Sequence, residues 1–322
     1  MRISIAMTTY NGSKYLNDQL KSFIQQDQAP DELIVCDDGS SDNTIKILEK
    51  FSLNAPFDVK IYQNESNLGF TKNFENALSK CTGDLIFLSD QDDIWFQNKI
   101  SSITEYFYLN ENISLIIHDA EIVDENLKYH GSNTLSQALR GFGNTNIYIT
   151  GALTVIRKDL LDYVFPFPEN INGHDGWIHN VGKVLERRQV LKKSLGLIRR
   201  HADNTSGWVA SSIEKISFFD VLKAQIHSVI KKPNQNYDDR ILLNHSLMKV
   251  IDKFKNNHNK DDIHFLSQKE NYLKSELSAL IRRNDMQSSS FLIRKLKALS
   301  LLLRGDYVYF NNVKSFIRDM IR

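Results

Sequence analysis

The feature that most constrains the fold is a regular alternation of short apolar runs and amphipathic runs over about the first ninety residues. Short apolar runs are typical of buried strands, and apolar residues at helical spacing between them are typical of helices packed on a sheet. The predicted strands are Ile3–Met7, Leu33–Cys36, Val59–Tyr62 and Leu85–Leu88. The first predicted helix ends near Gln25, and the next two are Thr44–Phe51 and Phe70–Lys80. Repeated strand–helix units predict an α/β fold with a parallel sheet and helices on both faces.

Polar residues gather directly after three of these strands, at Thr8–Asn11, Asp37–Asp42 and Asp90–Asp93. In such sheets ligands bind beyond the carboxyl ends of the strands, so we expect the three clusters to converge on one site. The sequence has neither a Gly-x-Gly-x-x-Gly motif after the first strand nor a Gly-Lys-Ser/Thr phosphate loop. A Rossmann cofactor domain and a P-loop hydrolase therefore both lack their main support.

Asp90-Gln91-Asp92-Asp93 is the segment with the most specific chemistry. Three carboxylates within four residues repel one another unless a cation is present. Hard divalent ions prefer oxygen ligands, and Mg²⁺ typically takes one or two carboxylates together with substrate phosphates. The segment therefore indicates a divalent-cation site, and a solvated acidic turn is the alternative.

Other candidate residues each have a structural alternative. Asp38 could accept hydrogen bonds from a base or ribose, although acidic residues also begin helices. Tyr10 offers an aromatic face for a nucleobase, or packs in a turn. Asp175, before the predicted helix Gly176–Glu186, could be a general base or a helix N-cap. His201 could be a metal ligand or a pyrophosphate contact, although a lone histidine is more often neither.

The charge of the chain gives no reason to expect a nucleic-acid partner. Forty basic residues against thirty-nine acidic ones leave no global field. The balance is uneven, because from Arg282 to the end nine Lys or Arg face three acids. In this tail an apolar stripe at helical spacing has basic residues among it, and the stripe comprises Phe291, Leu292, Leu296, Leu299 and Leu303. It could lie on an anionic membrane surface near a lipid-linked acceptor, or pack on the rest of the protein.

The cellular location is read from cysteines and apolar segments. Cys36 and Cys81 each lie in a run typical of a core, so we expect buried thiols and no disulfide. The first apolar run is too short for a secretory signal, and no stretch approaches the roughly 18 apolar residues of a membrane span. These observations predict a cytoplasmic protein whose membrane contact is peripheral.

The second half of the sequence changes character. Ile113–Ile117 and Tyr148–Ile156 are predicted to be further strands. Beyond about Ser212, glycine and turn residues nearly vanish and long Lys- and Asn-rich helical patterns begin. We therefore predict a catalytic domain over residues 1–211 and a helical region over residues 212–322.

Taken together, these segments resemble the family 2 glycosyltransferases, which have the GT-A fold. The blocks that carry the resemblance are Thr8–Gly12, Gln25–Thr44, Asn67–Leu78 and Gly83–Trp95. Three later segments, Ile149–Leu161, His174–Ile178 and Arg199–Gly207, look like the bacterial rhamnosyltransferase-type branch. The resemblance covers roughly residues 1–210. It implies a Rossmann-like mixed sheet with flanking helices, followed by a helical C-terminal extension.

The resemblance also implies a donor site. Thr8, Tyr10 and Asp38 would hold the base and ribose, and Asp90 would approach the ribose. Lys72 is near a position where relatives often have a basic residue close to the base.

The remaining implied roles concern the chemistry. Asp92 would coordinate Mn²⁺ or Mg²⁺ on the diphosphate, His201 would complete the metal or phosphate site, and Asp175 would be the catalytic base. One departure is Gln91, where the commonest family block has Ser or Ala.

The expected activity is inverting, metal-dependent transfer of a sugar from a nucleotide-sugar donor. The resemblance favours L-rhamnose from dTDP-rhamnose, or a hexose from a UDP-sugar. The acceptor would be a saccharide or lipid-linked saccharide in the synthesis of a bacterial surface polysaccharide such as capsule or O-antigen.

Two other functions compete with this one. A non-catalytic nucleotide-sugar-binding or scaffold protein of the same fold would require a damaged acidic block or base. A nucleotidyltransferase would require a Gly-rich, basic loop after the first strand, which Thr8–Gly12 is not.

Overall fold

The computed structural model describes residues 1–142, 145–146, 148–171, 173–202, 217, 237–258, 264–310 and 312–321. The chain forms two compact units, one comprising Met1–Phe167 and Ile171–Phe218 and the other comprising Pro168–Asn170 and Phe219–Arg322. The predicted boundary between residues 211 and 212 lies outside the described residues, and it stays a prediction.

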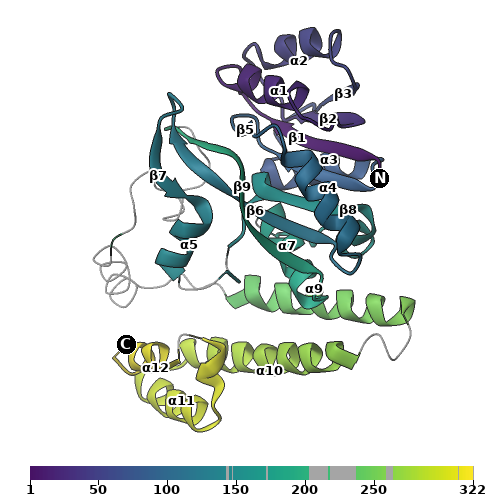
Figure 1. The fold of residues 1–322 in the computed structure, drawn as a ribbon. Helices are drawn as coiled ribbons and strands as arrows, with labels where there is room; N and C mark the ends of the chain where they lie inside the picture. The colour runs from purple at the N-terminus through teal and green to yellow at the C-terminus, as the bar shows by residue number, and fades with distance from the viewer. Residues whose placement is uncertain are drawn as a thin grey trace. The chain divides into compact units, whose positions relative to one another are not determined.

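The N-terminal unit is built on one mixed sheet (Figure 1). Its strands are β1 (Ile3–Thr9), β2 (Glu32–Asp37), β3 (Asp58–Gln63), β4 (Leu85–Ser89), β5 (Ile94–Trp95), β6 (Leu115–Asp124), β7 (Tyr129–Asn133), β8 (Thr154–Arg157) and β9 (Arg188–Arg200). Its α-helices are α1 (Leu16–Ile24), α2 (Thr44–Ser52), α3 (Phe70–Lys80), α4 (Lys99–Leu109), α5 (Thr134–Phe142), α6 (Leu161–Val164) and α7 (His174–Val184). The strand order is β3-β2-β1-β4-β8-β6-β9-β5, with β7 paired to β6.

The order and direction of the strands confirm the predicted mixed α/β sheet. β3, β2, β1 and β4 are parallel neighbours, whereas β8 runs antiparallel to both β4 and β6. β9 then pairs parallel with β6 and antiparallel with β5. The carboxyl ends of β2, β1 and β4 therefore lie side by side at one edge of the sheet.

Two features of the second half differ from the prediction. The predicted strand Tyr148–Ile156 is wrong in its first part, because Gly151–Leu153 is a 3₁₀ helix and β8 begins only at Thr154. Sequence analysis also did not predict β9, a strand of 13 residues. The exposed Lys192 and Lys193 in its middle interrupt the apolar pattern that would mark a buried strand.

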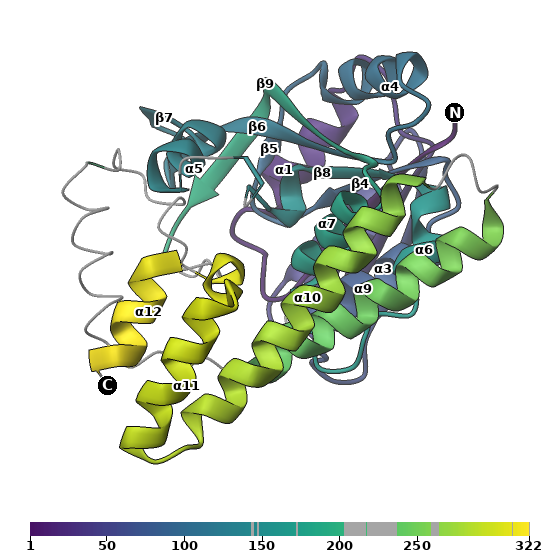
Figure 2. The same cartoon turned by 90° about the horizontal axis from the view of Figure 1, so that it is seen from below.

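Alternate residues of the parallel strands form the core on one face of the sheet. Ile5, Val35 and Phe87 are fully buried there against side chains of α1, α2 and α4. Figure 2 shows α1 and α4 on this face and α3, α6 and α7 on the other. Cys36 and Cys81 are buried free thiols, as predicted.

A polar network joins the amino ends of the same strands. The Glu32 carboxylate is fully buried and accepts hydrogen bonds from the Ser4 hydroxyl at 2.6 Å and the Thr82 amide at 2.6 Å. The Gly83 amide donates to the Ser4 hydroxyl at 2.8 Å. A Cβ at Gly83 would lie 2.7 Å from the Ser4 backbone nitrogen, so the backbones of β1 and the turn before β4 are in close contact here.

The C-terminal unit is helical, which confirms the predicted extension. Its elements are α9 (Tyr237–Asn257), α10 (His264–Gln287), α11 (Phe291–Leu303), a 3₁₀ turn at Asp306–Tyr309 and α12 (Asn312–Ile321). Arg283 of α10 is buried and donates two hydrogen bonds, of 3.0 and 3.2 Å, to the Asp319 carboxylate of α12. Among the described residues, no helix is both long enough and apolar enough to cross a membrane.

Gly83→Ala is predicted to destabilise the protein. The new Cβ would overlap backbone atoms that cannot rotate away, which typically costs about 1–3 kcal/mol. The matched control is Gly176→Ala in α7, where a Cβ meets nothing within 4 Å and the helix gains roughly 0.5–1 kcal/mol. Urea denaturation followed by tryptophan fluorescence gives both midpoints; a wild-type midpoint for Gly83→Ala would contradict the prediction.

Candidate active site

The three predicted polar clusters lie at one edge of the sheet. Tyr10 follows β1, Asp38 follows β2, and the loop 90–93 follows β4, and these three strands are parallel neighbours. The Asp38 amide donates to the Thr9 carbonyl at 2.8 Å, which fixes two of the loops to each other. The predicted convergence is confirmed for these strand ends.

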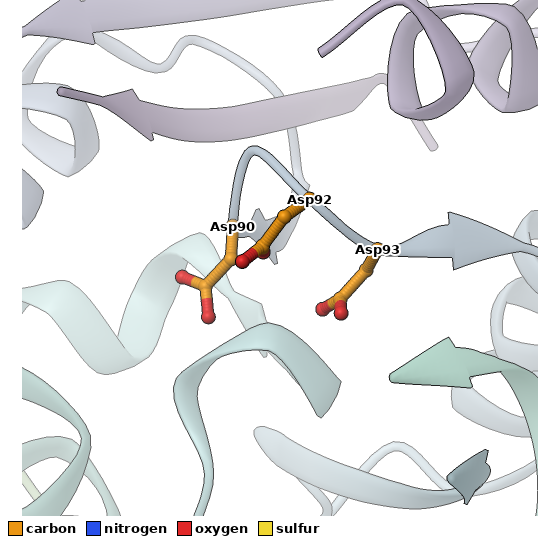
Figure 3. Close-up of side chains that lie close together, drawn as sticks. All are labelled: Asp90, Asp92 and Asp93. Atoms are coloured by element: carbon orange, nitrogen blue, oxygen red, sulfur yellow. The ribbon is translucent and has the colours of Figure 1, made fainter. Parts of the chain in front are cut away.

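Asp90, Asp92 and Asp93 form a tight carboxylate cluster between β4 and β5. One oxygen from each lies within 4.8 Å of the others, and Figure 3 shows the three carboxyl groups on the same side of the loop. Burial, with the charges of Asp92 and Asp175, raises the pKa of Asp90 to about 7. Burial and the charges of Asp92 and Asp90 also raise the pKa of Asp93. The cluster therefore holds negative charge at a high electrostatic cost.

A divalent cation fits this cluster. Three converging carboxylates supply the hard oxygen ligands that Mg²⁺ and Mn²⁺ prefer. His201 follows β9, and its Nε2 lies 2.8 Å from Oδ2 of Asp92. The structure thus brings His201 and Asp92 together, as the predicted metal site requires.

Arg199, at the end of β9, fixes the acidic loop in place. Its backbone amide donates to Asp93 at 3.2 Å, and its Nε donates to the Asp92 carbonyl at 3.0 Å. Its Nη2 donates to Asp18 of α1 at 2.7 Å, and its guanidinium lies 4.5 Å from the Tyr15 ring centroid. Sequence reasoning did not assign this function to Arg199, although the Arg-Arg-His run is a signal for it.

Lys99 is a second residue that sequence reasoning missed. It is 1% exposed, and its ammonium lies 3.7 Å from the Trp95 ring centroid. Burial lowers the pKa of Lys99 to about 7, while the charges of Asp93 and Asp90 act in the opposite direction. Lys99 therefore places a buried amine near the acidic cluster. A single lysine at a helix start carries no signal of burial.

Asp175 lies in the first turn of α7, close enough to the acidic cluster for its charge to act on Asp90. Its charge is one of the causes that raise the pKa of Asp90, so the two carboxylates interact. Its Oδ1 accepts a hydrogen bond from the Gly176 amide at 2.8 Å. Burial lowers the pKa of the adjacent His174 to about 4, and the His174 ring stacks on Phe74 with 3.8 Å between centroids. His174 is therefore neutral at pH 7.

The residues predicted to bind the base differ in exposure. Thr8 is half-buried near the end of β1, and the Tyr10 side chain is 49% exposed. Lys72 lies on the exposed side of α3, where it pairs with Glu75 at 2.6 Å.

Asp38 has a structural function that was not predicted. Its carboxylate accepts hydrogen bonds from the amides of Leu68 at 2.8 Å and Gly69 at 2.9 Å and from the side chain of Asn64 at 2.9 Å. These bonds fix the turn that leads into α3. They occupy three of the roughly four acceptor positions of a carboxylate, which leaves room for one further donor.

Comparisons with solved structures establish the fold. A crystal structure of residues 1–349 of TarS from S. aureus, in complex with UDP, superimposes with a TM-score of 0.53 at 17% identity. The superposition covers 98% of this chain and 90% of that chain. It shows a shared GT-A-type fold.

Comparisons of sequence identify relatives. An uncharacterized glycosyltransferase of Nostoc is 25% identical over 252 residues, or 74% of this chain and 75% of the relative. A dTDP-rhamnosyl transferase of Shigella flexneri is 36% identical over 108 residues, or 32% of this chain and 37% of the relative. A UDP-Glc:alpha-D-GlcNAc-diphosphoundecaprenol beta-1,3-glucosyltransferase of Escherichia coli is 34% identical over 172 residues, or 52% of this chain and 64% of the relative.

The family assignment comes from the profile described as Glycosyl transferase family 2, which matches residues 4–165. This range begins at the second residue of β1 and extends past β8, and it contains the acidic cluster and the loops around Tyr10 and Asp38. It is half of the chain. The chain therefore belongs to glycosyl transferase family 2.

Proposed function

We propose that this family 2 glycosyltransferase transfers a sugar with inversion, in a metal-dependent reaction, from a nucleotide-sugar donor to a saccharide or lipid-linked saccharide acceptor. The observation that carries the proposal is the cluster Asp90, Asp92 and Asp93 with Asp175 beside it. A metal site and a separate carboxylate base are the two parts that this chemistry needs.

The nucleotide half of the donor would lie over the ends of β1 and β2. Tyr10 presents an exposed ring on which a base can stack. Asp38 has one acceptor position left for an N–H or O–H group of the base or ribose. Thr8, near the end of β1, would contribute to the same site. Lys72 would contribute a positive charge at the rim if its side chain leaves Glu75. Asp90 would approach the ribose.

The diphosphate would lie at the acidic loop. Asp92 and His201 would hold Mn²⁺ or Mg²⁺ there, and when bound the cation neutralises charge on the leaving diphosphate. Arg199 binds the Asp92 carbonyl and so holds the acidic loop in place. The side chains that would bind the cation are therefore positioned before the cation arrives.

Asp175 would act as the general base. Its carboxylate takes the proton of the acceptor hydroxyl while the hydroxyl oxygen forms a bond to the anomeric carbon. The bond from that carbon to the diphosphate oxygen breaks, and its electron pair leaves with the nucleoside diphosphate. Attack opposite the leaving group inverts the anomeric centre, so no second carboxylate nucleophile is needed.

The relatives support a donor class and a pathway. One is named as a dTDP-rhamnosyl transferase, and another as a UDP-Glc-dependent enzyme acting on a diphosphoundecaprenol-linked sugar. For this chain we infer L-rhamnose from dTDP-rhamnose, or a hexose from a UDP-sugar. The product would be part of a bacterial surface polysaccharide such as capsule or O-antigen.

A peripheral contact with the cytoplasmic face of the membrane is part of the proposal. On α11, Leu292, Leu296 and Leu303 are 75%, 68% and 88% exposed. At about 100° per residue they lie on one side of the helix, and the buried Ala298 and Leu301 lie on the opposite side. Lys295 and Arg304 flank the exposed leucines, as in helices that bind anionic lipid surfaces.

Asp175→Asn is predicted to lower kcat by about 10²–10⁴-fold, because the acceptor proton then has no base. Donor binding should stay at the wild-type level. Asp58→Asn is the matched control, since Asp58 is exposed at the amino end of β3. Release of nucleoside diphosphate, measured with a dTDP-rhamnose or UDP-glucose donor and acceptor saccharides, gives the rates. Wild-type transfer by Asp175→Asn would exclude it as the base.

Asp92→Asn is predicted to remove the Mn²⁺-dependent part of donor binding. Loss of a carboxylate ligand should weaken metal affinity by at least the 10–100-fold typical of a lost supporting contact. The readout is the thermal stabilisation by UDP or dTDP with and without Mn²⁺, which reports ligand affinity. Asp58→Asn should keep the full Mn²⁺ effect; an equal effect in Asp92→Asn would argue against the metal assignment.

Leu292→Glu with Leu296→Glu is predicted to reduce binding to vesicles that contain anionic phospholipid. Two leucines that would enter the lipid interface would be replaced by negative charges, which the anionic surface repels. Leu53→Glu is the control, because Leu53 is 83% exposed in the other unit. Co-sedimentation with phosphatidylglycerol and with phosphatidylcholine vesicles measures the effect, and undiminished binding to the anionic vesicles would refute the membrane contact.

A further inference from the structure

Gln91 joins the acidic loop to the loop after β1. Its Oε1 accepts a hydrogen bond from the Tyr10 amide at 2.9 Å, and its Nε2 donates to the Tyr10 carbonyl at 3.1 Å. A single side-chain amide thus binds both backbone polar groups of Tyr10. Gln91 lies between Asp90 and Asp92, so the bonds connect the acidic loop to Tyr10, whose side chain is exposed.

Gly12 provides the space that the Gln91 amide occupies. A Cβ on Gly12 would lie 2.1 Å from Oε1 and 2.4 Å from Cδ of Gln91, and the three nearest atoms all belong to that side chain. Gly12 is not among the glycines with positive φ, so its backbone conformation is open to other residues. The Gln91 side chain is therefore the main reason for a glycine at this position.

The other side of the same loop is held by residues around the start of α2. The Asn11 amide donates to the Ser40 hydroxyl at 2.8 Å, and the Gly12 amide donates to the Thr44 hydroxyl at 2.9 Å. These bonds fix the residues after Tyr10. The two hydrogen bonds of Gln91 connect the Tyr10 backbone itself to the acidic loop.

We propose that Gln91 is a positioning residue that sets the distance between the nucleobase platform of Tyr10 and the diphosphate site at Asp92. The inference rests on the proposed function, in which Tyr10 stacks on the base. A side chain shorter than glutamine could not make both bonds, and Tyr10 would then have to be ordered when the donor binds. Gln91 orders Tyr10 before the donor binds, so binding does not carry the entropic cost of ordering it. This favours affinity for the whole nucleoside diphosphate.

The test is a set of four proteins: wild type, Gln91→Ala, Gly12→Ala and the double variant. Isothermal titration calorimetry with UDP and dTDP in saturating Mn²⁺ should show a Kd raised about 5- to 30-fold in Gln91→Ala, as expected for two lost hydrogen bonds. Gly12→Ala should be weakened to a similar degree, because its methyl group displaces the Gln91 amide. The double variant should be no weaker than Gln91→Ala alone, since the space is then empty.

Two further measurements separate positioning from general damage. The Kd for Mn²⁺ alone should stay within about twofold of wild type in Gln91→Ala, because Arg199 and His201 still hold Asp92. Hydrogen exchange at the Tyr10 amide should become faster, because its acceptor is gone. Thermal unfolding without ligand checks that each variant is folded.

The outcomes distinguish this proposal from the proposed function. The positioning role would be overturned by wild-type Kd values for UDP and dTDP in Gln91→Ala, or by additive effects of the two substitutions. The proposed function would survive either result, provided that Asp92→Asn still loses its Mn²⁺ effect. Equal weakening of Mn²⁺ alone and of the nucleotides would assign Gln91 to the stability of the acidic loop instead. If Asp92→Asn and Asp175→Asn both behave as wild type, the proposed function itself fails.

Discussion

The repulsion among three crowded carboxylates after β4, one buried and two half-buried, is the constraint on which the rest of the site depends. Asp90, Asp92 and Asp93 are held within a few ångströms of one another by a loop between two strands, in surroundings that raise two of their pKa values. Such a group is stable only with positive charge nearby. The fold supplies part of that charge through Arg200 and Lys99, whose charges act on the aspartates, and a divalent cation would supply more.

β9 is the element that brings these compensating groups to the loop. It lies in the sheet between β6 and β5 and ends with Arg199 and Arg200, and His201 follows directly, in contact with Asp92. Its contacts reach α1 as well, through the ion pair of Arg199 with Asp18. One strand therefore fixes the geometry of a loop that is more than a hundred residues earlier in the chain.

The sequence predicts most of what is local and little of what is distant. The strand–helix alternation up to Leu88 and the aspartates at strand ends could be recognised because neighbours in sequence carry the pattern. The break at Gly151–Leu153 could not, since its residues are as apolar as a strand. Lys99 and Gln91 show the same limit. Lys99 becomes buried, and Gln91 binds Tyr10, 81 positions away, only when the chain folds.

The buried network of Ser4, Glu32 and Thr82 stands at the amino ends of the strands, at the opposite end from the chemistry. This network holds the strands together without using residues of the candidate site, so exposed side chains of the loops at the carboxyl ends can change without disturbing it. Such a separation lets a lineage exchange one activated sugar for another by altering a few loop side chains. New specificity can arise on this scaffold without compensating changes in its core.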